Sequence, residues 1–157
     1  MTLADPEIAA EASSMSARVR LLRPGAVLPR QHSAAASGYD LHACLDGGAL
    51  EVGTSPRRVP TGIAMAVPPG LDVQIRPRSG LAARGVLAVL GTLDADYRGE
   101  LFVTLYCLTE PGCYVVEDGE RIAQLVVAQL APAQLELVDD LDVTPRGAGG
   151  HGSTGRQ

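Results

Sequence analysis

Residues 100–130 read ELFVTLYCLTEPGCYVVEDGERIAQLVVAQL, and they carry the clearest fold signal in the chain. Three short apolar runs are separated here by the turn formers EPG and EDG. Short apolar runs bounded by Gly, Pro and Asp are typical of β-strands joined by tight turns. Residues 100–130 therefore predict three consecutive strands.

The same pattern continues outward from this stretch. Similar apolar runs, bounded by turn formers such as PG, DGG and PPG, are VRLL, YDLHACL, LEV, GIAMAV, LDVQI, VLAVL and, after residue 130, ELV. With 18 glycines and 11 prolines, the chain has little room for long helices. We predict an all-β sandwich or barrel with one short helix at SGLAAR, residues 79–84, where Ser79 could act as the N-cap.

Both ends of the chain depart from this pattern. Residues 1–16 are rich in Ala, Glu and Ser with weak apolar periodicity, so we expect a disordered or loosely helical leader. Residues 144–157, TPRGAGGHGSTGRQ, are rich in glycine and almost free of apolar side chains, which predicts a mobile C-terminal arm. The intervening residues 17–143 fit the size of one β-domain in a chain of 157 residues.

The composition argues against several protein classes. No apolar run approaches the roughly 18 to 20 residues of a membrane span, and residues 1–16 lack the pattern of a secretory signal. We therefore expect a cytoplasmic protein with no membrane partner. The absence of lysine excludes a Walker-type phosphate loop and Schiff-base chemistry. The cysteines and histidines show neither the Cys-x-x-Cys spacing of a zinc or redox site nor a His-x-x-x-His ligand pair. They are Cys44, Cys107, Cys113, His32, His42 and His151.

The charged residues point to a small anionic ligand. All 13 basic side chains are arginines, whose planar fork suits phosphate oxygens. Against them stand 18 acidic residues, giving a net charge of −5, which argues against a broad nucleic-acid surface. A phosphate-binding function would therefore rely on a local cluster of arginines.

Five segments are denser in polar, ligand-type residues than a β-sandwich requires. They are ASGYDLHA (36–43), PRSGLA (77–82), GTLDADYRGE (91–100), GERIAQL (119–125) and RGAGGHGSTG (146–155). In the second segment, Arg78 and Ser79 offer donors and Gly80 allows a ligand to approach the backbone, a combination that suits an oxyanion. The alternative interpretation is that Arg78 is a surface charge and Ser79 only a helix cap.

The third and fifth segments suggest a hydrolytic site with a lid. A carboxylate of Asp94 or Asp96 could accept a proton from a water that attacks phosphorus, while Mg²⁺ neutralises the phosphates. The alternative for these aspartates is a solvated turn. In the glycine-rich arm, Arg146 could pair with a terminal phosphate and His151 could stack on a base. The alternative for the arm is a plain linker.

With all five segments in this order, the chain from about Val19 to Gly155 resembles the trimeric deoxyuridine triphosphate nucleotidohydrolases, or dUTPases. The resemblance implies a jelly-roll-like β-fold and a homotrimer whose three active sites each combine segments of all three subunits. It also implies hydrolysis of dUTP to dUMP and pyrophosphate, with Mg²⁺ held mainly by the triphosphate. Such an activity limits uracil in DNA and supplies dUMP for dTMP synthesis.

The resemblance assigns roles on the phosphate side of the site. Asp40 would reach the Mg²⁺ shell through water. The phosphates would be cradled by Arg78, Ser79 and Gly80. Gln124 would assist in binding them.

On the nucleoside side, the resemblance makes Asp94 the base that activates water and a ligand of the 3′-hydroxyl. Thr92 and Leu93 would line a hairpin that reads uracil mainly through its backbone. Tyr97 would pack under the deoxyribose and exclude a 2′-hydroxyl.

The arm completes the implied site, in which Arg146 grips the γ-phosphate and His151 covers the base. Two features depart from the family pattern. Many relatives have Phe where His151 stands. In the uracil hairpin, Ala88 stands at the usual Asn position, and residues 84–91 look about three residues shorter than usual. Because the chain contains no Asn, its base-reading hairpin must work through backbone groups alone.

Three other functions remain open at the level of the sequence. A broader deoxynucleoside triphosphate pyrophosphohydrolase would follow from the altered hairpin. A dCTP deaminase shares the fold, but such enzymes carry a glutamate where this chain has Thr104, and a Ser-Ser-x-x-Arg string in place of Arg-Ser-Gly at residues 78–80. A non-catalytic nucleotide-binding relative would not require the full set of polar segments.

Overall fold

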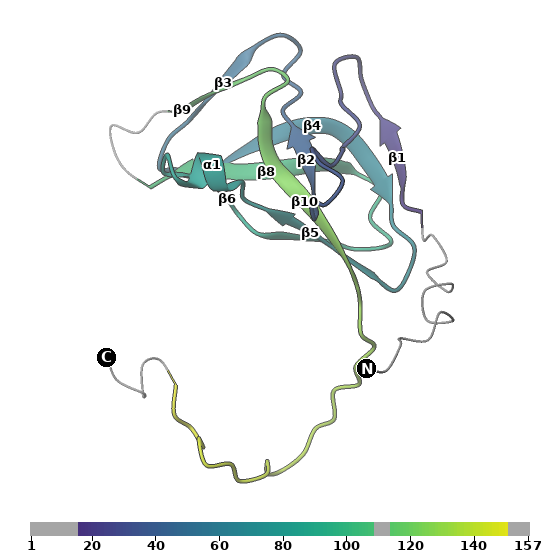
Figure 1. Ribbon diagram of the computed structural model, residues 1–157, viewed down its shortest axis with the longest axis vertical. Coiled ribbons are helices and arrows are strands. Elements are labelled where there is room, and N and C mark those ends of the chain that lie inside the picture. The colour runs from purple at the N-terminus through teal and green to yellow at the C-terminus, as the bar shows by residue number, and fades with distance from the viewer. Residues whose placement is uncertain (1–15, 109–113, 151–157) are drawn as a thin grey trace, which may run out of the picture.

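The computed structural model describes residues 16–108 and 114–150. Their regular secondary structure consists of β-strands and one helical turn, as the sequence predicts (Figure 1). The elements are β1 (Arg18–Leu21), β2 (Gly38–His42), β3 (Ala49–Val52), β4 (Arg57–Ala66), β5 (Leu71–Arg76), α1 (Ser79–Ala82), β6 (Val86–Ala88), β7 (Gly91–Leu93), β8 (Glu100–Cys107), β9 (Tyr114–Glu117) and β10 (Arg121–Gln129).

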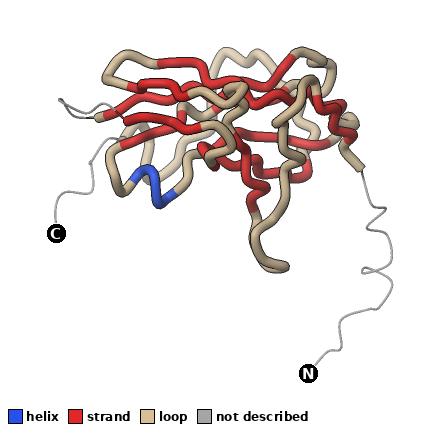
Figure 2. The backbone as a smooth tube through the Cα atoms, turned by 90° about the horizontal axis from the view of Figure 1, so that it is seen from above, coloured by secondary structure: helices blue, strands red, loops and turns tan. Residues whose placement is uncertain are grey.

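Two four-stranded antiparallel sheets form the body. One has the strand order β1-β4-β8-β6 and the other β2-β10-β5-β7, while β3 and β9 make a separate two-stranded ribbon. Figure 2 shows the strands stacked in layers, with the single helical turn at one end of the body. Neighbouring strands in each sheet are mostly distant in the sequence, as expected of a jelly-roll-like arrangement.

The core lies where the two sheets face each other. Strand β8 alternates strictly, with Leu101, Val103 and Leu105 buried and the intervening side chains partly exposed. Val73 of β5 and Leu125 of β10 are buried from the second sheet. Each such side chain stabilises the fold by roughly 1.5–3 kcal/mol relative to exposure. This core holds β2, β5 and β10 in the positions that build the site described below.

Cys44 and Cys107 are buried free thiols, as expected, and Cys113 lies outside the described residues. In the described part of the chain, no group of three or more His, Cys, Asp or Glu side chains is placed to hold a metal ion. No helix in the described part of the chain is long and apolar enough to cross a membrane.

The hairpin that the resemblance implies around residues 84–93 is not built from paired β6 and β7, which corrects that expectation. Strand β6 pairs with β8, whereas β7 pairs with β5 in the other sheet. The amide of Val89 continues the first pairing by donating to the Thr104 carbonyl at 2.8 Å. A two-residue hairpin turn requires a positive φ, which Val and Leu disfavour, so the chain stays extended through Val89 and Leu90 and changes sheets.

Residues beyond β10 also differ from expectation. The apolar run ELV, residues 136–138, forms no strand, and the segment after Leu130 leaves the body as an extended tail (Figure 1). Leu135 and Leu137 are 99% and 100% exposed. Local apolar alternation cannot form a strand without an edge to pair with, and residues 136–138 pair with none of the described strands. Residues 1–15 of the expected leader and residues 151–157 of the arm lie outside the described residues.

Candidate active site

A row of polar side chains crosses the second sheet. Gln124 on the central strand β10 lies opposite Asp40 on β2 and opposite Arg76 on β5. Directly opposed residues in antiparallel strands share a face, so these three side chains stand on the same side of the sheet. The period-2 rule also places Gly38 and Val126 on this face.

This face forms the floor of an open cleft of about 420 Å³. The residues around it come from four segments of the chain: the loop before β2, strand β2, the end of β5 together with the start of α1, and strand β10. They are His32, Ala36, Ser37, Gly38, Asp40, Arg76, Arg78, Ser79, Gly80, Arg121, Gln124 and Val126. Three arginines and a single carboxylate therefore line the cleft, which favours an anionic ligand.

Asp40 is held between two of these arginines. Its Oδ1 lies 3.3 Å from Nε of Arg78, and its Oδ2 lies 3.2 Å from a terminal nitrogen of Arg121. Arg78 also donates a hydrogen bond to the main-chain carbonyl of Arg121 at 2.9 Å. The carboxylate and the carbonyl together fix the guanidinium plane of Arg78 at the wall of the cleft.

Gln124 and Gly38 pack against each other, and this contact explains the glycine. The Gln124 amide nitrogen donates to the Pro77 carbonyl at 3.0 Å. A Cβ added at Gly38 would lie 2.1 Å from Oε1 of Gln124, well inside van der Waals contact. Glycine at this position therefore allows the Gln124 side chain to lie across β2 at the floor of the cleft.

Helix α1 borders the cleft with Ser79 and Gly80. Arg78, in an extended conformation, occupies the N-cap position and makes no side-chain capping hydrogen bond. Ser79 is thus the first helical residue and not the cap, which corrects the sequence prediction. A Cβ at Gly80 would meet nothing within 4 Å, so the cleft is open on this side.

His42 lies two residues beyond Asp40 on β2, at the border of an adjoining cavity of about 690 Å³. Burial lowers the pKa of His42 below its usual value, while the nearby Asp40 carboxylate acts in the opposite direction. Its buried Nδ1 has no hydrogen-bond partner in the structure. Burial therefore favours the neutral form of the His42 ring.

The residues assigned to the nucleoside do not border this cleft in the same chain. Leu93 is buried in β7, whereas Thr92 and Asp94 are exposed on either side of it. The Tyr97 hydroxyl donates to the Glu100 carbonyl at 3.0 Å, which fixes its ring in a turn after β7. One chain thus brings together the phosphate-type side chains and leaves Asp94 and Tyr97 at a separate surface.

The tail beyond β10 runs away from the body (Figure 1). Arg146 in this tail does not border the cleft and donates to the Gly149 carbonyl at 2.8 Å, within a local turn. His151 lies outside the described residues.

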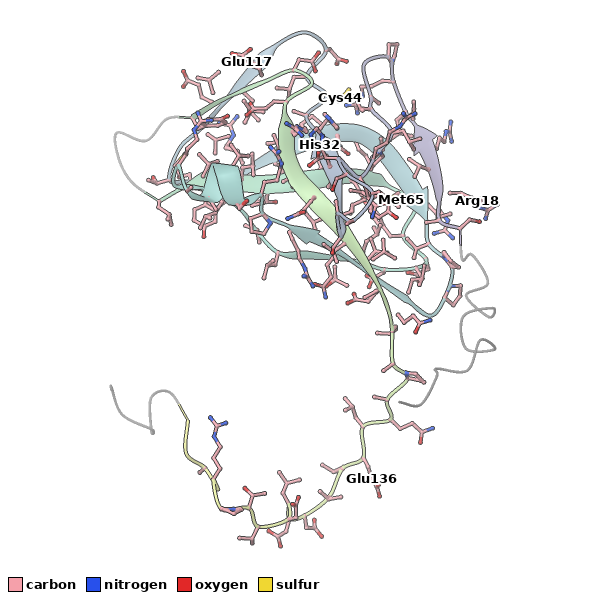
Figure 3. The ribbon with its side chains drawn as sticks, viewed as in Figure 1. Arg18, His32, Cys44, Met65, Glu117 and Glu136 are labelled. Atoms are coloured by element: carbon pink, nitrogen blue, oxygen red, sulfur yellow. The ribbon has the colours of Figure 1, made fainter. Side chains whose placement is uncertain are left out.

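Among the cleft residues to which the sequence assigned no role, Arg121 and His32 lie close to each other. Arg121 belongs to a recognised polar segment but immediately follows a turn, so its direction could not be foreseen. His32 belongs to the loop before β2; Figure 3 places it beside β2 and β10, and its Nδ1 lies 3.5 Å from a terminal nitrogen of Arg121. Nothing in the spacing of either residue marks it as a ligand contact.

Comparison with known proteins agrees with this geometry. The family model for dUTPase matches residues 25–155, which include all the residues bordering the cleft. The chain belongs to the dUTPase family. It is 46% identical over 145 residues to the deoxyuridine 5′-triphosphate nucleotidohydrolase of Syntrophotalea carbinolica, covering 90% of this chain and 98% of that protein. The enzyme of the same name from Treponema pallidum is 46% identical over 143 residues, covering 88% and 97%.

Among solved structures, the fold is similar to that of a dUTPase variant from Staphylococcus bacteriophage 80alpha in complex with dUpNHpp. The TM-score is 0.77 at 25% sequence identity, and the match covers 90% of this chain and 99% of the phage chain. The antiparallel β-architecture of this dUTPase family member is the one that its sequence predicts.

Proposed function

We propose that this protein is a dUTP diphosphatase that hydrolyses dUTP to dUMP and pyrophosphate. The observation that carries the proposal is the cleft in which Asp40, Gln124 and the Arg78-Ser79-Gly80 turn meet, in a chain belonging to the dUTPase family. The curated relatives with 46% identity are nucleotidohydrolases of dUTP, which favours this reaction over deamination of dCTP and over binding without catalysis.

In this reaction a water oxygen bonds to the α-phosphorus, and the bond from that phosphorus to the α–β bridging oxygen breaks. Asp94 accepts the proton of the attacking water. Arg78, Gln124 and the amides near Gly80 bind the negative charge on the phosphoryl oxygens, and this interaction strengthens as charge develops in the transition state. Pyrophosphate leaves with the electron pair of the broken bond.

The cleft fits a magnesium ion that arrives with its substrate. Mg²⁺ in phosphate sites is commonly held by one or two carboxylates together with substrate phosphates and several waters. Among the described residues, Asp40 is the one carboxylate that borders the cleft. A single carboxylate suits an ion held mainly by the substrate, and not one coordinated entirely by protein side chains. Asp40 would hold the ion through water, and the bound ion would neutralise charge on the phosphates.

We further propose that the protein works as a homotrimer with shared sites. Asp94 and Tyr97 do not border the cleft of their own chain, which supports an assembly in which the base and the deoxyribose contact come from another copy. The exposed leucines of the tail support the same assembly, because contiguous apolar side chains at a surface usually mark an interface. The arm, residues 144–157, would then close over the ligand with Arg146 on the γ-phosphate and His151 on the base.

Hydrolysis in water enriched in oxygen-18 tests the proposed reaction. We expect dUMP and pyrophosphate in equal amounts, with the heavy isotope in dUMP because water attacks the α-phosphorus. Mass spectrometry of the two products measures this distribution. Label in pyrophosphate would place the attack on the β-phosphorus, and release of orthophosphate would show cleavage at a different bond; either result contradicts the proposal.

A further inference from the structure

The strand pair β2–β10 contains an irregularity next to the cleft. Gln124 pairs with Asp40 and Ala123 with Leu41, but His42 pairs with Arg121 instead of Ile122. Strand β10 thus carries one extra residue, Ile122, at this point. An extra residue in one strand of an antiparallel pair is a β-bulge, which locally changes the direction of the side chains.

The bulge moves Arg121 from one face of the sheet to the other. In a regular strand, side chains alternate, so Arg121 would share the core face with Ala123 and Leu125. Instead, Ile122 and Ala123 are both fully buried, and Arg121 borders the cleft together with Gln124 and Val126. The inserted residue therefore has two effects. The apolar side chain of Ile122 lies in the core where the Arg121 guanidinium would otherwise be buried, and the positive charge of Arg121 lies in the site.

Arg121 makes contacts in two directions once it lies there. Its terminal nitrogen donates to Oδ2 of Asp40 at 3.2 Å, and its main-chain carbonyl accepts from Arg78 at 2.9 Å. The Asp40 carboxylate is 17% exposed, against 41% for the Arg121 side chain, so this ion pair is partly shielded from water. Arg121 therefore contacts two of the side chains that the proposed reaction places around the triphosphate, Asp40 and Arg78.

We propose that Arg121 is a positioning residue, directed into the cleft by the bulge at Ile122, which fixes the Asp40 carboxylate for the phosphates and their cation. This inference rests on the proposed function. Without Arg121, both oxygens of Asp40 would be available to Arg78, and a fork-to-fork pair would form. Such a pair would occupy donors of Arg78 that the phosphates require. By holding Oδ2, Arg121 leaves Asp40 bound to Arg78 through Nε alone.

Substitution of Arg121 tests this role in the full-length protein. Arg121→Met keeps the length of the side chain and removes its charge, while Arg121→Lys keeps the charge and one donor. We expect Arg121→Met to lower kcat/KM by about 10- to 100-fold, the usual loss when a partner of a ligating group is removed. Arg121→Lys should recover most of it. Binding of an α,β-imido analogue of dUTP, measured by calorimetry, should weaken in the same order.

A double-substitution cycle separates positioning from direct contact with the ligand. If Arg121 acts through Asp40, then Asp40→Asn combined with Arg121→Met should lose no more activity or affinity than Asp40→Asn alone. Arg57→Gln, which removes an exposed arginine of β4, is the matched control for net charge and should behave as the wild type. Thermal melting of every variant reports whether the fold is preserved.

Two results would overturn the inference. One is wild-type kcat/KM and affinity in Arg121→Met; the other is a double variant whose loss equals the product of the two single losses. If Arg121→Met does not fold, Arg121→Gln is used in the same cycle with the same expectations. Because the wild-type protein is assayed with dUTP in parallel, failure of the proposed function would appear as an inactive wild type and is distinguishable from failure of the role of Arg121.

Discussion

Asp94→Asn is expected to remove nearly all hydrolysis of dUTP while leaving the fold and nucleotide binding intact. The substitution preserves the size of the side chain but removes the group that accepts the water proton, a loss of about 10²- to 10⁴-fold in kcat. Asp94 is exposed after the buried Leu93, so the core does not change. Release of pyrophosphate at saturating dUTP gives kcat, and calorimetry with the imido analogue gives affinity.

Asp96→Asn is the matched control, because it removes an equally exposed carboxylate two residues along the same turn. We expect it to retain activity close to that of the wild type. Near wild-type release of pyrophosphate by Asp94→Asn, or an equal loss in both variants, would contradict the role of Asp94 as the base.

Mixing two inactive chains tests whether this base acts in a neighbouring copy's site. Asp94→Asn and Arg78→Gln chains are each expected to be inactive alone. In randomly mixed assemblies, about a quarter of the sites would combine an intact Asp94 from one chain with an intact Arg78 from another. Activity should therefore reappear after joint refolding. Its complete absence in mixed, correctly sized oligomers would mean that both residues serve one site from the same chain.

Truncation after Val143 is expected to lower kcat/KM on the order of 10²-fold, as loss of one charge-stabilising donor commonly does. Stability should hardly change, because Arg146 and Gly147 hydrogen-bond only within their own turn, to Gly149 and Thr144. A segment with so few contacts to the body adds little to global stability. Steady-state kinetics and thermal melting of the truncated protein measure the two effects.

Arg146→Gln in the full-length chain is the control for the truncation. If the arm acts by binding the γ-phosphate, this single substitution should account for a large part of the loss in kcat/KM. A truncated protein that loses melting temperature in parallel with activity would show that residues 144–157 are structural, which contradicts their role as a lid.

Much of the fold follows from local patterns in the sequence. The apolar runs at 100–108 and 122–130 correspond to β8 and β10, because their turn formers and alternation are local signals. The short helix forms near its predicted place, although it begins one residue earlier than a Ser79 cap would imply. The run at 136–138 failed as a prediction because a strand needs a partner edge, which local sequence cannot supply.

The candidate site was also predictable only where local sequence signals mark its residues. Asp40, Arg78 and Gln124 were identified from their segments, and the structure brings them together across β2, β10 and the turn after β5. The direction of Arg121 depends on one extra residue in the pairing of β10 with β2, a property of the pair and not of either strand. The crossing of Val89 and Leu90 between sheets is likewise set by which strands find partners.

The altered segment at residues 86–93 makes base selectivity the most informative property of this protein. Leu90 is 71% exposed in a two-residue connection, and no Asn side chain is available to read the base. The most direct measurement is pyrophosphate release with Mg²⁺ from dUTP, dCTP, dTTP and UTP at matched concentrations. We expect dUTP to be hydrolysed far faster than the other three, with backbone groups of β7 as the proposed partners of uracil. Equal rates across the four nucleotides would contradict the assignment as a dUTP diphosphatase.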